Sequence, residues 1–260
     1  MGYNLTVRQV YYQLVSRDIV PNNLGSYQLT SRVLKDARMS GLVDWDTIED
    51  RVRQTIMPNE FDDVTEFINA AINSYRLPRW KDQDHYVEVI VEKEALAGIL
   101  RPLTNRYHVL LLPNKGYSSA SAIHEAAQRF IYQTSSEEKQ CHILYLGDHD
   151  PSGMDMVRDI QDRLDELLCT VSVEKIALTM EQIKQYNPPP NLVKKSDSRS
   201  KKYVSEYGNK SWELDALKPE VLNELVESNI KKYLDMKKYD DVVSQEEREK
   251  LRLVELSSVV

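Results

Sequence analysis

The chain has little of several features that mark common classes of protein. Its two cysteines, Cys141 and Cys169, lie far apart and match no metal-binding or redox spacing, and its five histidines are scattered. No apolar run is long enough to cross a membrane, and the N-terminus lacks the pattern of a secretory signal. Neither a Walker motif nor a dinucleotide-binding glycine motif is present. These absences argue against a zinc site and a P-loop enzyme, and they predict a cytoplasmic protein with no membrane partner.

The composition allows a sizeable core. The 260 residues, of which 41% are hydrophobic, have room for one large domain or two smaller ones. The net charge of −7 gives no overall attraction for nucleic acid. However, the distribution of charge matters more for such binding than the sum, and acids that bind a metal ion are neutralised in use.

The stretch from Ile143 to Met156 combines a strand pattern with two acids. A short apolar run, Ile143–Leu146, is typical of a buried strand, and a glycine ends it. Asp148 and Asp150 follow one residue apart, and a proline and Gly153 then favour a turn into a helix. Ligands of open α/β sheets bind beyond the carboxyl ends of the strands, which is where these acids are expected.

A second predicted strand ends in a matching acid. Tyr86 to Val91 is mostly apolar, and Glu92 stands at its end before a helical pattern begins. Three carboxylates at the ends of two strands suit Mg²⁺ (or Mn²⁺), which takes few protein oxygens and leaves sites for water and phosphate. The alternative is that Glu92, Asp148 and Asp150 are ordinary solvated turn residues. Together with Gly153, these acids resemble the Toprim domain of primases, topoisomerases and several nucleases.

The N-terminal part reads as a set of short helices. Thr6 and Gln9 form a capping-box pattern, after which Tyr11 falls on an apolar stripe while Tyr12 lies off that stripe, one turn beyond Arg8. A second helix, Tyr27 to Met39, exposes the basic residues Arg32, Lys35 and Arg38. Short helices, a basic helix and a short β-like return at Leu42, Val43 and Trp45 fit a winged-helix module. In helix-turn-helix modules the second helix of the turn enters the DNA major groove. We predict a winged-helix-like DNA-binding domain over residues 1–80.

Residues 81–260 are predicted to form a second domain. Strand and helix patterns alternate along it, which indicates a parallel, Rossmann-like sheet followed by C-terminal helices. The fold class is therefore α/β, and in the terms of the resemblance this is the Toprim domain. Within it, Asn191 to Tyr203 is predicted to be a mobile basic loop that carries Lys194 and Lys201. This loop either contacts phosphates or is simply solvated.

Four motifs occur in the order seen in one family: TVRQVYY, VEKEAL, NKGYSS and GDHDPSG. The chain thereby resembles the topoisomerase VI A subunit and the related meiotic double-strand-break protein, and more specifically their compact stand-alone forms in phages and mobile elements. The resemblance implies that Tyr12 is the nucleophile, with Arg8 as the motif arginine. It also implies metal ligands at Glu92, Asp148 and Asp150, and a DNA-contacting loop at Lys115.

The resemblance implies a homodimer acting on DNA in the prokaryotic cytoplasm, at the nucleoid, because in this family nucleophile and acids meet across a dimer. The chain departs from the family in starting almost at the Tyr12 helix and in having Ser118-Ser119 where a Pro-Asp pair stands. ATP-driven strand passage with an ATPase partner subunit is therefore not expected. Three functions follow: a DNA-cleaving transesterase, a Toprim nuclease that activates water, or a DNA-binding protein without turnover.

Overall fold

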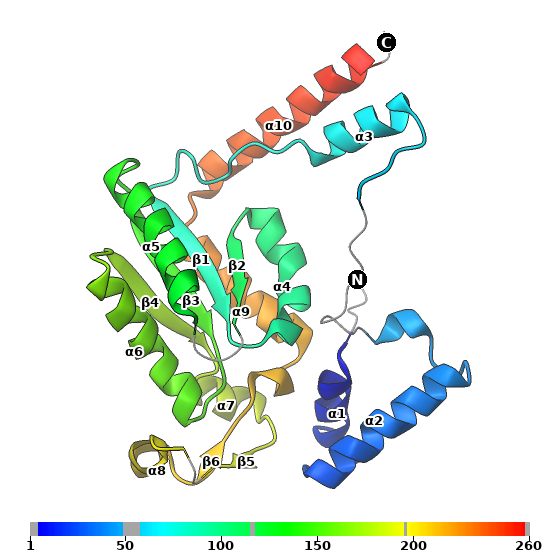
Figure 1. The fold of residues 1–260 in the computed structure, drawn as a ribbon, viewed down its shortest axis with the longest axis vertical. Helices are drawn as coiled ribbons and strands as arrows, with labels where there is room; N and C mark the ends of the chain where they lie inside the picture. The colour runs from blue at the N-terminus through cyan, green and yellow to red at the C-terminus, as the bar shows by residue number, and fades with distance from the viewer. Residues whose placement is uncertain (1–4, 49–57, 115–117, 195–196, 258–260) are drawn as a thin grey trace.

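A four-stranded parallel sheet forms the centre of the molecule (Figure 1). The computed structural model describes residues 5–48, 58–114, 118–194 and 197–257. The strand order is β2-β1-β3-β4, so β1 and β3 are the two central strands. This confirms the α/β class and the parallel sheet predicted for the second half of the chain.

The helices and strands alternate along residues 85–177 as the sequence predicts. The elements, in chain order, are α1 (Val7–Val15), α2 (Leu24–Met39), η1 (Trp45–Thr47), α3 (Val64–Ser74), β1 (His85–Val91), α4 (Glu94–Tyr107), β2 (Leu110–Pro113), α5 (Ala120–Ser135), β3 (Gln140–Leu146), α6 (Pro151–Glu166), β4 (Val171–Ala177), α7 (Met180–Tyr186), β5 (Asn191–Leu192), α8 (Ser200–Tyr207), β6 (Lys210–Ser211), η2 (Leu214–Ala216), α9 (Pro219–Lys232) and α10 (Met236–Ser257).

Alternating side chains of the central strands fill two separate apolar layers. Val89 of β1 and Leu144 of β3 face α4 and α9, whereas Ile90 and Tyr145 face α5 and α6. Burial on both faces explains why these strands are nearly continuous apolar runs rather than alternating ones. β1 and β3 are paired through Val91 and Leu146, so the residues that follow each strand leave the sheet side by side. The topology thus brings Glu92 next to the turn that holds Asp148.

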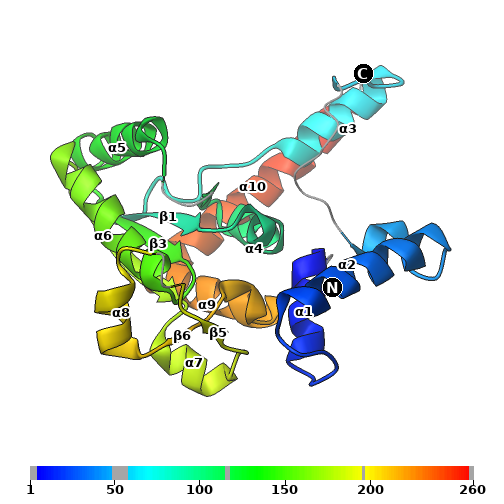
Figure 2. The same cartoon turned by 60° about the horizontal axis from the view of Figure 1, so that its bottom comes forward.

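The N-terminal helices α1 and α2 lie beside the α/β body rather than within it (Figures 1 and 2). The winged-helix prediction is not confirmed for this part of the chain. The β-like return expected around Trp45 is instead the 3-10 turn η1, and the strand pairing seen in residues 5–48 is a single bridge between Leu5 and Ile48. Leu42, which was expected to contribute to this return, is 84% exposed and so has no packing that would hold it in a strand.

Helix α3 packs against the C-terminal helix α10, far from α1 and α2 in both views (Figures 1 and 2). The apolar stripe of α3 is largely exposed, since Val64 is 68% and Phe67 54% exposed, whereas Ile72 is buried. Trp80, just after α3, belongs to the same apolar cluster as β1 and α4. None of the helices in the described part of the chain combines the length and the apolar character needed to cross a membrane.

The predicted basic loop, Asn191 to Tyr203, is partly regular structure, which corrects the sequence-based expectation. Its first two residues form strand β5, which pairs with β6, and helix α8 begins at Ser200. The physical reason is Tyr203, whose ring is buried and whose hydroxyl donates to the carbonyl of His149 at 2.8 Å. A buried aromatic anchor fixes this segment against the turn that carries the acids.

Candidate functional site

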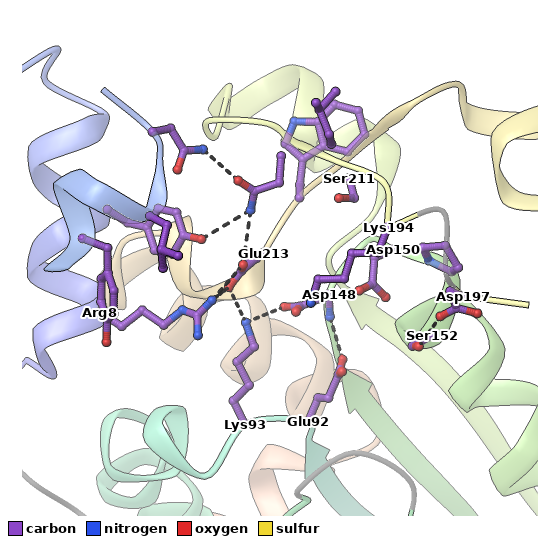
Figure 3. Close-up of a pocket in the computed structure, with 18 of the residues that line it drawn as sticks. Arg8, Glu92, Lys93, Asp148, Asp150, Ser152, Lys194, Asp197, Ser211 and Glu213 are labelled. Carbon is purple, nitrogen blue, oxygen red and sulfur yellow. Dashed lines mark hydrogen bonds and ion pairs between the residues drawn. The ribbon is translucent and has the colours of Figure 1, made fainter. Parts of the chain in front are cut away.

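A pocket of about 770 Å³ lies where helix α1 faces the carboxyl ends of β1 and β3. Figure 3 shows Arg8 pointing into it from the side of α1, and Glu92 and Asp148 from the side of the sheet. Its lining includes the predicted nucleophile Tyr12, the motif arginine Arg8 and the three predicted metal ligands, Glu92, Asp148 and Asp150. The structure therefore brings the tyrosine helix and the acids together within one chain, so a second copy is not needed to bring them together.

Glu92 is held over the start of the Asp148 turn. Its Oε2 accepts hydrogen bonds from the backbone N–H of Asp148 (2.9 Å) and from the hydroxyl of Tyr145 (3.3 Å). Gly147 permits this approach, because a Cβ at that position would stand 2.6 Å from the same Glu92 oxygen. The glycine that ends the strand in the sequence is thus required by the close approach of a side chain from the neighbouring strand.

Asp148 and Asp150 are each held by a backbone N–H. Asp148 Oδ1 accepts from the N–H of Leu214 at 2.8 Å. Asp150 caps helix α6, with its Oδ1 accepting from the N–H of Gly153 at 2.7 Å. Gly153 is required by its surroundings, since a Cβ there would lie 2.3 Å from the carbonyl oxygen of Asp148. The glycine of the GDHDPSG motif is therefore explained by the close approach of the Asp148 carbonyl.

His149, between the two aspartates, is buried in an aromatic cluster and is more than the turn residue that its position suggests. Its Nδ1 lies 2.7 Å from the hydroxyl of Tyr203, and its ring makes edge contacts with Tyr207 and Trp212. Its backbone N–H and carbonyl both pair with Trp212. This clamp connects the acidic turn to residues 203–214, which come from a distant part of the sequence.

Burial and mutual repulsion change the ionisation of the acids. Burial, and then the charge of Asp148, raise the pKa of Glu92 to about 6. Burial also raises the pKa of Asp150, although its hydrogen bond from Gly153 opposes this. Burial lowers the pKa of Lys175 to about 8, and its Nζ donates to the carbonyl of Asp148 at 2.6 Å. The site therefore holds negative charge that its own cations balance only in part.

The chemistry of the three acids fits a hard divalent cation, but they are not assembled around one. Among the described residues, no group of three or more histidine, cysteine, aspartate and glutamate side chains is placed to hold a metal ion. In that part of the chain, hydrogen bonds to Glu92, Asp148 and Asp150 use a single oxygen of each. The second oxygen of each carboxylate accepts no hydrogen bond there. These oxygens therefore suit a metal ion, because carboxylate oxygens are the ligands that Mg²⁺ prefers.

Tyr12 is 3% exposed, which corrects the prediction that it lies on an open face of its helix. The apolar stripe of α1 does carry Tyr11, which is buried as predicted and donates to Asn22 Oδ1 at 3.0 Å. The neighbouring face of α1 is covered by η2, and Tyr12 packs there with Ala216. Helical periodicity identifies one buried face and gives no sign of a second partner some 200 residues away.

The Tyr12 hydroxyl reaches the pocket through a polar contact, because Asn191 Nδ2 donates to it at 3.4 Å. Burial, and then the charge of Glu213, raise the pKa of Tyr12 to about 12. Arg8 lies beside it, but its guanidinium is paired with Glu213 at 2.7 Å and with Asp215 at 3.5 Å. In this state the phenol is neutral at pH 7 and the motif arginine is bound to internal carboxylates.

Three polar residues that connect α1 with the acids were not singled out from the sequence: Lys93, Asn191 and Glu213. Lys93 Nζ lies 3.0 Å from Asp148 Oδ1 and 3.0 Å from Glu213 Oε2 (Figure 3). Burial works against its charge, but Asp148, Asp215 and Glu213 together raise the pKa of Lys93. Its position directly after Glu92 was the available signal. Asn191 is the first residue of the predicted basic loop, but as a neutral side chain it was not singled out, and Glu213 belongs to a segment without a recognisable motif.

The predicted DNA-binding residues are spread over the surface rather than gathered at this pocket. Lys194 lines the pocket, whereas Lys201 is exposed on α8. Arg32 and Lys35 are exposed on α2 and line a separate hollow. Arg38 lines that hollow too, but its guanidinium donates to the carbonyl of Trp45 at 2.8 Å and stacks over that ring. The predicted contact at Lys115 lies outside the described residues.

Comparison with known proteins adds no relative. No protein-family model matches the chain, and no curated protein matches it in sequence. The likeness to the topoisomerase VI A subunit therefore remains a resemblance carried by the four motifs, and function has to be argued from the geometry of the pocket.

Proposed function

We propose that the protein is a Mg²⁺-dependent, DNA-cleaving transesterase of the topoisomerase VI A type. The observation that carries the proposal is that Arg8, Tyr12 and the three acids Glu92, Asp148 and Asp150 line one pocket. A tyrosine hydroxyl, a permanent cation and a set of carboxylates are the groups that phosphoryl transfer to a tyrosine requires. The position of the pocket, at the carboxyl ends of parallel strands, is the usual place for a ligand.

In the proposed reaction the Tyr12 phenolic oxygen attacks the phosphorus of a backbone phosphodiester. The new P–O(Tyr) bond gives a 5′-phosphotyrosyl link, and the P–O3′ bond breaks. The 3′-oxygen leaves with a proton as a 3′-hydroxyl, so the phenolic proton is balanced. Arg8, which stays protonated at all relevant pH values, offsets the charge on the phosphate and favours the phenolate. Since burial raises the pKa of Tyr12 to about 12, attack requires DNA binding to bring cationic groups closer to its oxygen.

Glu92, Asp148 and Asp150 would hold the Mg²⁺ or Mn²⁺ ion. When bound there, the ion would stabilise negative charge on the phosphate and on the leaving oxygen. Asp148 would offer the ion its Oδ2, because its Oδ1 accepts from the N–H of Leu214 and lies 3.0 Å from Lys93 Nζ. Lys175 keeps the Asp148 turn in place through the carbonyls of Asp148 and Gly153 (2.6 and 3.1 Å).

The finer assignments belong to the same proposal. The sheet with its acids would be a Toprim domain, and α1 and α2 a variant of the winged-helix module that presents Tyr12. DNA would run over the pocket, with phosphate contacts from Lys194 and Lys201 and, on the α2 side, from Arg32 and Lys35. Cleaving both strands of a duplex requires two tyrosines, which favours a homodimer, and DNA as substrate favours the nucleoid in the cytoplasm.

A metal-dependent nuclease is the second candidate, because Tyr12 is buried. At 3% exposure, with a neutral phenol at pH 7, Tyr12 is poorly placed to attack unless the helix moves. In that case the acids and their metal ion would activate water, and Tyr12 would serve packing against η2. The products distinguish the two: the nuclease leaves free ends and no protein on the DNA.

The test is incubation with plasmid labelled throughout its length and Mg²⁺, followed by a denaturing gel. Labelled DNA that migrates with the protein supports the transesterase, and its loss in Tyr12→Phe assigns the nucleophile. Free cut ends without attached protein would replace this proposal with the nuclease. Intact DNA that shows only a mobility shift would indicate a DNA-binding protein without turnover. Asp148→Asn is the matched metal-site control, since it removes a charge while keeping the shape of the side chain.

A further inference from the structure

Glu213 lies at the centre of the pocket, although it belongs to no motif. Its carboxylate accepts hydrogen bonds from Arg8 Nη2 (2.9 Å), Asn191 Nδ2 (3.2 Å) and Lys93 Nζ (3.0 Å). These three donors come from α1, the N-cap of α4 and β5, which are distant in sequence. Asn191 also donates to the Tyr12 hydroxyl, and the charge of Glu213 raises the pKa of Tyr12, so the Glu213 carboxylate lies beside the proposed nucleophile.

The donors around Glu213 match the recognition of a phosphodiester. A guanidinium, an ammonium and an amide N–H converge on two oxygens that share one negative charge, as a phosphodiester does with its two unbridged oxygens. The alternative, a structural ion pair, does not require three donors from separate elements or an opening onto a pocket. The carboxylate faces that pocket with 20% of its side chain exposed. A carboxylate therefore stands where a phosphate beside Tyr12 would find its donors.

The backbone around Glu213 is held firmly, so its carboxylate could leave the three donors only by rotation of the side chain. Trp212 pairs with His149 through both backbone groups, and the N–H of Leu214 donates to Asp148. Because successive residues of an extended segment face opposite sides, Trp212 packs with the aromatic rings while Glu213 points at Arg8 and Lys93. The side chain of Glu213 can turn away without disturbing this clamp.

We propose that Arg8, Lys93 and Asn191 form the subsite for the DNA phosphate next to Tyr12, and that Glu213 occupies this subsite as an internal competitor when DNA is absent. The inference rests on the proposed function for the identity of the ligand. A phosphate must displace the Glu213 carboxylate, so Glu213 weakens DNA binding and keeps Arg8 and Lys93 paired until DNA arrives. Specific affinity for DNA is thereby lower than the donors alone would give.

The test compares Glu213→Gln with wild type in binding a fluorescein-labelled duplex, measured by anisotropy. EDTA is present so that no metal-dependent cleavage takes place. Glu213→Gln should bind the duplex at least about threefold more tightly, because the competing charge is removed. Glu224→Gln, which removes the same charge from an exposed position on α9, should change affinity much less. Adding Arg8→Gln to Glu213→Gln should abolish the gain, since the donor that is freed would be missing.

Affinity for Glu213→Gln equal to or below that of wild type, in a folded protein, would overturn the proposal. Loss of the covalent adduct in Glu213→Gln with unchanged affinity would also overturn it, and would make Glu213 the group that receives the Tyr12 proton. Tighter binding without an adduct in any variant would refute the transesterase and leave the subsite standing. If Glu213→Gln fails to fold, Glu213→Asp gives a weaker form of the test: it keeps the charge, but its shorter side chain cannot reach all three donors, so binding tighter than wild type is still expected, and unchanged affinity would count against the proposal.

Discussion

Replacing Glu92 with Gln should stabilise the protein at alkaline pH in the absence of metal. The substitution keeps a side-chain oxygen that can accept from the N–H of Asp148, but it removes one charge from the acidic site. Burial and the charge of Asp148 raise the pKa of Glu92 from its ordinary value of 4.5 to about 6. The folded state thus prefers the protonated acid, and this contribution to stability is present below pH 4.5 and is lost as the pH rises through 6.

The size of the effect follows from the pKa. A pKa raised by about 1.5 corresponds to a free energy of unfolding lower by about 2 kcal/mol once the group is ionised. Glu92→Gln should therefore be more stable than wild type by up to about 2 kcal/mol at pH 8, and should lose that advantage near pH 4. Urea unfolding followed by circular dichroism, in EDTA at both pH values, measures this difference.

Mg²⁺ should reverse the order of stability of wild type and Glu92→Gln. Mg²⁺ that binds the folded state stabilises wild type, whereas Glu92→Gln has lost a ligand and gains less. Glu224→Gln is the matched control, because it removes an exposed glutamate and should show no such dependence on pH or metal. The reasoning is refuted if Glu92→Gln is no more stable than wild type at pH 8 without metal.

Two further predictions concern what holds the site in place. Glu88 is fully buried on β1 and pairs with both Nε (2.7 Å) and Nη2 (2.9 Å) of Arg129. Arg129→Met should therefore lower the free energy of unfolding by about 3 to 5 kcal/mol, more than Glu88→Gln, because it leaves a buried carboxylate with the hydrogen bond from Tyr86 but no cationic partner; equal losses in urea unfolding would argue against this. Gly153→Ala places a Cβ against the carbonyl of Asp148 and should displace the acidic turn. Calorimetry should then show weaker Mg²⁺ binding than in Gly25→Ala, where the nearest atom is 3.4 Å away.

The sequence was sufficient to predict the sheet and the acids because their signals are local. Apolar runs ended by Gly147 or by Glu92 indicate buried parallel strands, and parallel strands bring their carboxyl ends to one edge. The turn chemistry of Gly153 and the capping role of Asp150 likewise depend on neighbours within a few residues. These are the parts of the site where the prediction and the structure agree.

The rest of the site depends on contacts between distant segments, which no local pattern encodes. Tyr12 is buried because η2, from the other end of the chain, covers the second face of its helix. The sequence predicts Arg38 as an exposed basic residue, but in the structure its guanidinium stacks over the ring of Trp45. Asn191 and Glu213 enter the pocket because the acidic turn is clamped to the segment around Trp212. Their roles follow from tertiary structure alone.

The most direct test of the central claim is to identify the residue that becomes linked to DNA. After reaction with plasmid and Mg²⁺, the protein is digested with nuclease and trypsin, and the peptides are analysed by mass spectrometry. Cleavage after Arg8 and Arg17 releases the peptide Gln9–Arg17, which contains Tyr11 and Tyr12. We expect a nucleotide attached to Tyr12, as located by fragmentation of that peptide. A nucleotide on Tyr11, or cut plasmid with this peptide unmodified, would contradict it.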